Sequence, residues 1–209
     1  MYDFLEINDC NSAYFKEVIE IYNNSFPENE RNPLEKIVKR ITQKSSKLYG
    51  YILDNHIIAF AFLAELENNY ILLDYFAVKK EYQGKGIGSR VIDLIISSLK
   101  NKTLILEVEN PEFGEDWILR KKRVEFYQKK GIKILKNVKY ILPPLDNSDN
   151  YTEMILMIFN NNQDDIKISN SEIINLISDI YSKIYNRQNN DIYLIQIIRT
   201  IGNIKEISF

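Results

Sequence analysis

The stretch YFAVKKEYQGKGIGSRVIDLI, residues 75–95, combines an apolar run, a glycine cluster and an amphipathic run. The apolar run that ends at Val78 predicts a β-strand, and the apolar residues after Ser89 recur at helical spacing. Glycines keep side-chain bulk away from a loop, and the backbone N–H groups at a helix start form the positive end of the helix dipole. A strand, a glycine loop and a helix in this order therefore predict a phosphate-binding site.

The glycine cluster differs from the two best-known phosphate loops. A P-loop needs Ser or Thr after its lysine, whereas Gly86 follows Lys85. A dinucleotide-binding loop needs a third glycine where Ser89 stands, and it needs a parallel strand–helix–strand context. The β runs within residues 48–78 are instead separated by short Asp-Asn and Asn-Asn turns. These turns predict an antiparallel meander ahead of the glycine cluster.

Periodicity and turn residues predict the remaining elements. Asn11 or Ser12 can cap a first helix, and Pro33 suits the first turn of a second one. The predicted helices span residues 12–24, 33–41, 89–100, 119–130 and 173–184, and the predicted β runs span 48–53, 57–66, 70–78, 103–109, 132–142 and 151–159. The polar residues 160–165 predict a linker, and the apolar run 191–201 leaves its type open.

The composition limits the classes of function. Lys and Arg total 27 against 29 acidic residues, so the net charge of −2 gives no general attraction to nucleic acid or anionic lipid. Cys10 and His56 are the single cysteine and histidine, too few for a Cys/His zinc site, and we expect no metal. The sequence lacks an apolar run of the ~18 residues that span a membrane and a basic leader. We therefore expect a cytoplasmic protein that binds neither membrane nor nucleic acid.

A second motif lies downstream of the glycine cluster. The segment RVEFYQKKGI, residues 123–132, places Tyr127 four residues before Gly131. Together the two motifs resemble the GNAT superfamily of N-acetyltransferases, in its bacterial type. The family's loop pattern is Gln or Arg, two residues, Gly, one residue, then Gly or Ala, and the matching residues here are Gln83, Gly86 and Gly88.

The resemblance covers residues 1–160 and implies the acyl-CoA N-acyltransferase fold, an α/β fold whose mixed sheet splays at its fourth strand. Residues 161–209 are predicted to be a mainly helical C-terminal extension packed on this domain. At the splay, the strand's backbone would pair with the pantetheine arm of acetyl-CoA, and the loop's N–H groups would bind the pyrophosphate. The implied contacts are Phe76, Ala77, Val78, Gln83, Gly84, Lys85, Gly86, Ile87, Gly88 and Ser89.

Acetyl transfer needs a base for the amine and an acid for the departing thiol. Tyr127 matches the family's tyrosine, so the resemblance implies that it is the general acid. Glu107, in the segment LILEVE, matches the base of the ribosomal-protein N-terminal acetyltransferases. Asp74 is a second candidate for the base, and an ordered water is a third.

The resemblance also implies an acceptor pocket between the first two helices and the late strands. Its candidate residues are Phe26, Glu30, Arg31 and Tyr140. The predicted function is transfer of an acetyl group from acetyl-CoA to a primary amine of a small molecule or a peptide terminus. The alternatives are a non-catalytic acyl-CoA-binding regulatory module and, for residues 165–209, a surface for homodimer formation. Packing of that segment on the chain's own sheet is the favoured prediction.

Overall fold

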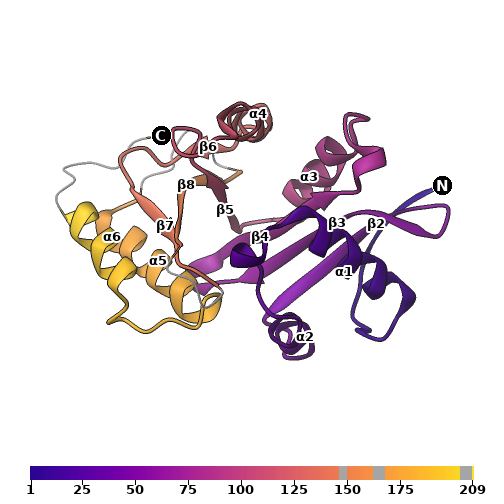
Figure 1. The fold of residues 1–209 in the computed structure, drawn as a ribbon, viewed down its shortest axis with the longest axis horizontal. Coiled ribbons are helices and arrows are strands. Elements are labelled where there is room, and N and C mark those ends of the chain that lie inside the picture. The colour runs from indigo at the N-terminus through magenta and orange to yellow at the C-terminus, as the bar shows by residue number, and fades with distance from the viewer. Residues whose placement is uncertain (146–149, 162–167, 203–208) are drawn as a thin grey trace.

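An eight-stranded mixed sheet forms the centre of the molecule (Figure 1). The structure is a computed structural model that describes residues 1–145, 150–161, 168–202 and 209. The strand order is β1-β2-β3-β4-β5-β8-β6, with β7 beside β8, and β4–β5 is the one parallel pair among the described strands. The strands are β1 (Tyr2–Glu6), β2 (Ser46–Leu53), β3 (His56–Glu65), β4 (Tyr70–Val78), β5 (Thr103–Glu109), β6 (Lys133–Ile134), β7 (Tyr140–Leu142) and β8 (Thr152–Phe159).

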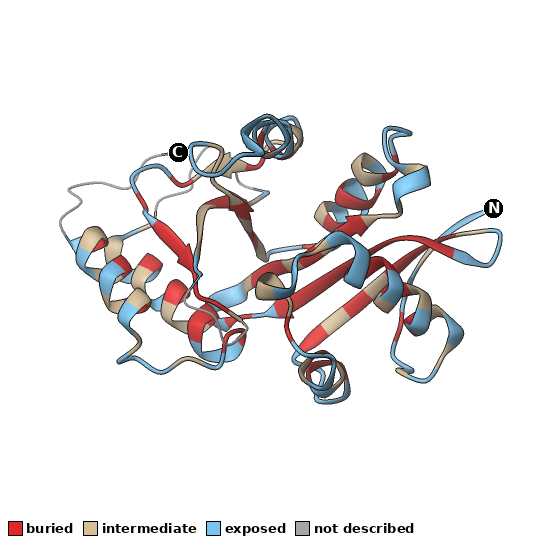
Figure 2. Cartoon of the chain, in the orientation of Figure 1, coloured by how far each residue is buried: buried red, intermediate tan, exposed pale blue. Residues whose placement is uncertain are grey.

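Helices cover both faces of the sheet (Figure 1). α1 and α2 pack on one face, and α3 and α4 pack on the other, so each face has a separate apolar cluster. Figure 2 shows the buried residues concentrated on the strands and on the helix sides that meet them. The helices are α1 (Ala13–Ser25), α2 (Leu34–Thr42), α3 (Ile87–Ser98), α4 (Trp117–Gln128), α5 (Asn170–Lys183) and α6 (Ile192–Gly202), with short 3₁₀ turns η1 (Glu28–Glu30), η2 (Glu67–Asn69) and η3 (Lys80–Tyr82).

A β-bulge at Asp74 accompanies the splay of the sheet. On β3 the consecutive residues Phe62 and Leu63 pair with Tyr75 and Leu73, which leaves Asp74 as an extra residue. The pairing of β4 with β5 ends at the same point, at Leu73. A bulge bends its strand and increases the local twist, so the ends of β4 and β5 diverge beyond it. The prediction of a mixed sheet that splays at its fourth strand is confirmed.

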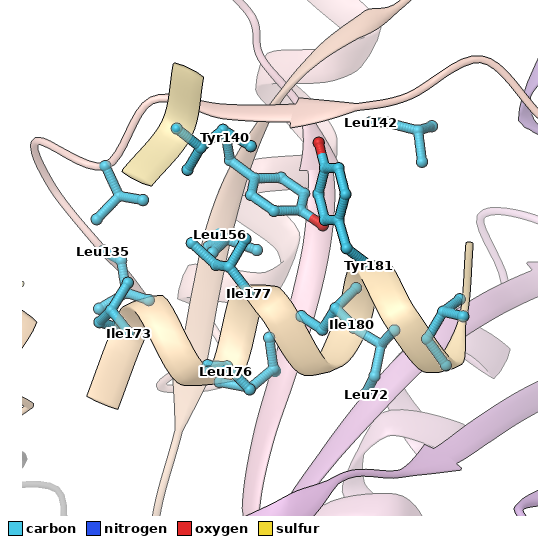
Figure 3. Close-up of a cluster of buried hydrophobic side chains, with 14 of the residues drawn as sticks. Leu72, Leu135, Tyr140, Leu142, Leu156, Ile173, Leu176, Ile177, Ile180 and Tyr181 are labelled. Atoms are coloured by element: carbon cyan, nitrogen blue, oxygen red, sulfur yellow. The ribbon is translucent and has the colours of Figure 1, made fainter. Parts of the chain in front are cut away.

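The C-terminal helices pack on the chain's own sheet (Figure 3). The α5 residues Ile173, Ile177 and Ile180 are each 0% exposed, and their cluster includes Leu72 of β4 and Leu156 of β8. A capping box between Ser169 and Glu172 fixes the start of α5. The apolar stripe that could have required a second copy of the chain is therefore covered within one chain.

The structure differs from the predicted elements in three places. β1 was not predicted, because it is a short edge strand with mostly exposed side chains and no clear alternation. The single β run predicted for 132–142 is broken into β6 and β7, and Asn137 between them has a φ of 66°, which a strand does not accommodate. The open run 191–201 forms α6, whose first N–H groups are capped by the Asp191 carboxylate. Of the predicted linker, residues 162–165 lie outside the described residues.

Candidate active site

A cleft of about 1540 Å³ opens where β4 and β5 diverge. It runs from the glycine loop, past the strand ends, to the loop after α1 and the segment after α5. Arg31, Lys85, Ile87 and Tyr140 lie outside its wall. The predicted site residues that line it are Phe26, Glu30, Asp74, Phe76, Ala77, Val78, Gln83, Gly84, Gly86, Gly88, Ser89, Glu107 and Tyr127.

The end of β4 forms one wall of the cleft and has a free backbone edge. From Tyr75 onward β4 pairs with β3 on one side but no longer with β5 on the other. The side-chain amide of Gln83 donates a 2.9 Å hydrogen bond to the Val78 carbonyl, which ties the loop to the strand end. An extended group that carries amides can therefore pair along this edge as an added strand would.

The glycine loop presents unpaired backbone donors at the start of α3. Among the described residues, no acceptor pairs with the N–H groups from Gly84 to Ser89. Gly84 and Gly86 have φ values of 73° and 77°, and a Cβ atom on either would meet nothing within 4 Å. The loop is thus a set of N–H groups at a helix N-terminus with open space above it, which suits a phosphate group.

Two predicted loop residues turn away from the cleft. Lys85 places its ammonium 5.3 Å from the centre of the Tyr82 ring, outside the cleft wall. Ile87 is 4% exposed and packs in the apolar cluster under α3. Ile87 can contribute to a phosphate site only through its backbone, and Lys85 only after its side chain moves.

Glu107 accepts two hydrogen bonds on one carboxylate oxygen. The hydroxyls of Tyr140 and Tyr185 both donate to Oε1, the latter at 2.5 Å, and no described residue donates to Oε2. Burial raises the pKa of Glu107 to about 7, although the two phenols, as donors, oppose this shift. A carboxyl group with such a pKa can lose or take a proton near neutral pH.

Glu109 lies two residues further along β5 but has a different environment. It forms ion pairs with Arg120, at 3.4 Å, and with Arg123, both from α4. Arg120 also donates to the Phe113 carbonyl, so it ties the long connection before α4 to the strand. Glu109 is thereby committed to holding α4 in place, whereas Glu107 has no ion-pair partner among the described residues.

Tyr127 lies on the side of α4 that faces the cleft, and it is 7% exposed. Burial raises the pKa of its phenol to about 12, while the charge of Arg123 opposes the shift. No described residue forms a hydrogen bond with its hydroxyl. The phenol is therefore protonated at neutral pH and keeps its proton available for a bound group.

Asp74, the second candidate for the base, is paired with a buried cation. Its carboxylate lies 2.7 Å from the Arg40 guanidinium, and the two side chains are 3% and 7% exposed. Burial raises the pKa of Asp74 and the Arg40 charge lowers it. The guanidinium also lies over the ring of Phe62 and donates to Ser46, so the pair is part of the packing between α2 and the sheet.

The predicted acceptor residues separate into two groups. Phe26 and Glu30 line the cleft, and Glu30 accepts a 3.1 Å hydrogen bond from Thr152 of β8. Burial raises the pKa of Glu30, and the Thr152 hydrogen bond opposes this. Arg31 does not line the cleft and donates a hydrogen bond to Asn23. Tyr140 is only 1% exposed and reaches the site through its hydrogen bond to Glu107. Tyr140 can therefore influence an acceptor through Glu107 but does not line the cleft.

The sequence prediction missed three residues that shape this site. Tyr185 comes from the segment after α5, Arg40 from α2, and Arg123 lines the cleft from α4. Only Arg123 had a local signal, because it belongs to the same motif as Tyr127. Tyr185 lies 78 residues from Glu107 along the chain, and only the tertiary structure brings them together.

Within the described ranges, no three His, Cys, Asp or Glu side chains form a group that could hold a metal ion. A search of the same residues finds no helix with the length and apolar character to cross a membrane.

Comparisons with a family model and with a curated protein indicate the same family. The model of the acetyltransferase (GNAT) family matches residues 15–131, more than half of the chain. In Bacillus subtilis (strain 168), the protein YjbC, whose name assigns it to the acetyltransferases, is 34% identical over 86 residues. This match covers 41% of the present chain and 41% of YjbC, so less than half of that relative is represented.

Solved structures share the fold at low sequence identity. A GNAT-family protein from Bacteroides thetaiotaomicron superposes with a TM-score of 0.68 and 22% identity over 91% of this chain and 98% of its own. A GNAT acetyltransferase from Elizabethkingia anophelis, with acetyl-CoA bound, has a TM-score of 0.52 and 21% identity. That comparison covers 76% of this chain and 97% of the other.

Proposed function

Because the chain belongs to the GNAT family of acetyltransferases, we propose that it transfers an acetyl group from acetyl-CoA to a primary amine. The acceptor is a small molecule or the N-terminus of a peptide or protein, and its amine attacks the thioester directly. The observation that carries this proposal is a single cleft with unpaired backbone donors at one end and an unpaired carboxylate oxygen and phenol further along it.

Acetyl-CoA is proposed to lie along β4 and the glycine loop. The edge of Phe76–Val78 that β5 leaves open pairs with the amides of the pantetheine arm, although the Val78 carbonyl already accepts from Gln83. The N–H groups of Gly84–Ser89 hold the pyrophosphate. These contacts use backbone atoms, so binding depends on unobstructed access to the backbone more than on the identity of the side chains. The bound acetyl-CoA of the Elizabethkingia anophelis relative supports the choice of co-substrate.

Glu107 is proposed to be the general base. It takes a proton from the amine as the new C–N bond forms, and its raised pKa of about 7 suits that task near neutral pH. Asp74 is less suited, because its carboxylate is committed to Arg40 at 2.7 Å. If an ordered water is the base, the pH profile of Glu107→Gln will be parallel to that of the wild type.

Tyr127 is proposed to be the general acid. It gives its proton to the sulfur as the C–S bond breaks, so the products are the acetylated amine and the free thiol of coenzyme A. Its phenol is protonated at neutral pH, as an acid must be, because burial raises its pKa to about 12. The proton taken up by Glu107 replaces the one lost by Tyr127 through solvent, so the enzyme ends each cycle unchanged.

The acceptor is proposed to enter beside Phe26 and Glu30. The cleft there also has apolar walls from Leu142 and Met154, and carboxylates at Glu30 and Glu107. Acidic groups near apolar walls favour a cationic amine on a partly apolar carrier. Arg31 and Tyr140 remain candidates that would act without direct contact.

We also propose that residues 1–160 form the catalytic domain and residues 161–209 its helical extension. The Elizabethkingia anophelis structure is covered almost fully by 76% of this chain, which supports an addition to a common domain. The net charge of −2 supports the proposal that the protein has no nucleic-acid partner. A cytoplasmic location is also part of the proposal.

Release of free thiol from acetyl-CoA, measured with a panel of primary amines, tests the proposed activity. Tyr127→Phe keeps the ring and removes the hydroxyl, so turnover should fall by roughly 10²–10⁴-fold while acetyl-CoA binding persists. For the wild type we expect kcat/KM to rise toward pH 7 as Glu107 loses its proton, and Glu107→Gln should lack this rise. Tyr51→Phe, a buried tyrosine of the same apolar cluster outside the cleft, is the matched control.

No amine-dependent thiol release by the wild type, despite acetyl-CoA binding, would favour a non-catalytic acyl-CoA-binding module. Wild-type kcat in Tyr127→Phe would remove the acid, and a Glu107→Gln pH profile parallel to wild type would assign the base to Asp74 or to water. The thermal midpoint of each variant, measured alongside, separates lost chemistry from lost folding.

A further inference from the structure

The segment after α5 places an aromatic hydroxyl inside the cleft. Tyr185 follows the last residue of α5 by two positions, lines the cleft and is 6% exposed. Its hydroxyl donates a 2.5 Å hydrogen bond to Oε1 of Glu107. A residue from the C-terminal extension therefore touches the carboxylate proposed as the base.

Tyr185 and Tyr140 together fix the orientation of Glu107. Both phenols donate to Oε1, one from the extension and one from β7. Within the part of the chain that the structure describes, Oε2 has no donor, so it is the oxygen that can accept a proton from a bound amine. Two donors on one oxygen restrict rotation of the carboxylate and keep the other oxygen available.

The ring of Tyr185 is held in place by the extension itself. It meets the ring of Tyr181 edge-on, with centres 5.6 Å apart, and Tyr181 donates to the Ile141 carbonyl of β7 at 2.5 Å. Figure 3 shows Tyr181 and Tyr140 projecting toward each other between α5 and β7. Two residues after Tyr185 in the chain, Arg187 donates to the Pro144 carbonyl at 2.7 Å. The position of Tyr185 thus depends on the packing of α5 and on the turn that follows it.

We propose that Tyr185 is a positioning residue for the base, so that the C-terminal extension completes the active site. This inference rests on the proposed role of Glu107. Tyr185 does not exchange a proton with the substrate: its hydroxyl orients the carboxylate and stabilises its charged form. The extension would then be required for turnover and not only for stability.

The charged and titratable groups around Glu107 determine how its pKa changes when the Tyr185 hydroxyl is removed. Burial raises the pKa of Glu107, Asp74 on β4 raises it further, and the hydrogen bonds from Tyr140 and Tyr185 and the charge of Arg40 on α2 lower it. Removing the Tyr185 hydroxyl removes one group that favours the carboxylate. The pKa of Glu107 should therefore rise, and the base should be protonated over a wider range of pH.

Tyr185→Phe tests this proposal in the full-length chain. Proteins labelled with ¹³C at the glutamate carboxyl are titrated by NMR, and the Glu107 signal is assigned by its absence in Glu107→Gln. We expect the pKa of Glu107 to rise by about one unit in Tyr185→Phe. The acid side of the kcat/KM profile should move by the same amount, with acetyl-CoA affinity unchanged.

Tyr181→Phe is the matched control, because it also removes a buried tyrosine hydroxyl from the C-terminal extension, one that donates to the Ile141 carbonyl. Tyr181→Phe should lower the thermal midpoint. It should shift the pKa of Glu107 by much less than Tyr185→Phe does. An unchanged Glu107 pKa in a folded Tyr185→Phe, or equal shifts in both variants, would overturn the positioning role. Failure of the proposed function looks different, because the wild type would then release no thiol in the presence of an amine, whatever the NMR titration shows. If only the base role of Glu107 is wrong, Glu107→Gln keeps wild-type turnover.

Discussion

Replacing Ile177 by alanine tests whether the C-terminal extension and the sheet unfold as one unit. Ile177 is 0% exposed, in a cluster that includes Leu72 of β4 and Ile105 of β5, the two strands that border the cleft. Truncation of a buried isoleucine to alanine removes apolar contacts and leaves a cavity, at a cost of about 2–5 kcal/mol. In a chain of this size each kcal/mol lowers the thermal midpoint by roughly 2–4 °C. We therefore expect a decrease of roughly 5–15 °C.

Circular dichroism measured against temperature and against urea provides the assay, with one cooperative transition expected for the wild type and for Ile177→Ala. Ile192→Ala is the matched control, because Ile192 lies on α6 of the same extension but is 70% exposed. Its unfolding free energy should change by no more than about 0.5 kcal/mol. The reasoning is refuted if the wild type unfolds in two steps and Ile177→Ala shifts only the first, with acetyl-CoA binding retained between them.

Two further changes test the loop and the buried ion pair. Gly86→Glu adds bulk and negative charge where φ is 77°, so acetyl-CoA affinity measured by calorimetry should fall roughly tenfold or more. Gly202→Glu is the control. Unchanged affinity in a folded Gly86→Glu would refute the assignment of the phosphate site. Arg40→Met leaves Asp74 buried without its counter-charge, so urea unfolding should show a loss of about 3–5 kcal/mol. A loss below about 1 kcal/mol would mean that Asp74 is neutral in the folded protein.

The parts of the fold that the sequence predicts are those determined by neighbouring residues. The glycine loop, with positive φ at Gly84 and Gly86, lies between a strand and a helix as its composition indicates. Tyr127 likewise faces the cleft on a predicted helix. Asp191 is a further local signal, because its carboxylate accepts from the first N–H groups of α6 and an aspartate in that position is typical of a helix start.

The remaining features depend on contacts between distant segments. The hydrogen bond from Tyr185 to Glu107 follows from how α5 packs, and no local pattern distinguishes Tyr185 from the other tyrosines among the chain's 14. The different environments of Glu107 and Glu109 also depend on distant residues, because α4 provides the two arginines that pair with Glu109. In the segment ILLDYFAV both alternating sets of positions are apolar apart from Asp74, so periodicity cannot locate the bulge.

The bulge at Asp74 makes the site depend on the number of residues in β4. Before it, Leu73 faces the cluster under α3, and after it Tyr75 and Ala77 face α1 and α2, so the alternation changes phase there. Deleting one residue would restore an unbroken alternation and remove the bend that separates β4 from β5. Side-chain replacements in this segment leave the phase intact. Related chains that keep the cleft should therefore keep the number of residues between positions 71 and 78, even where the side chains differ.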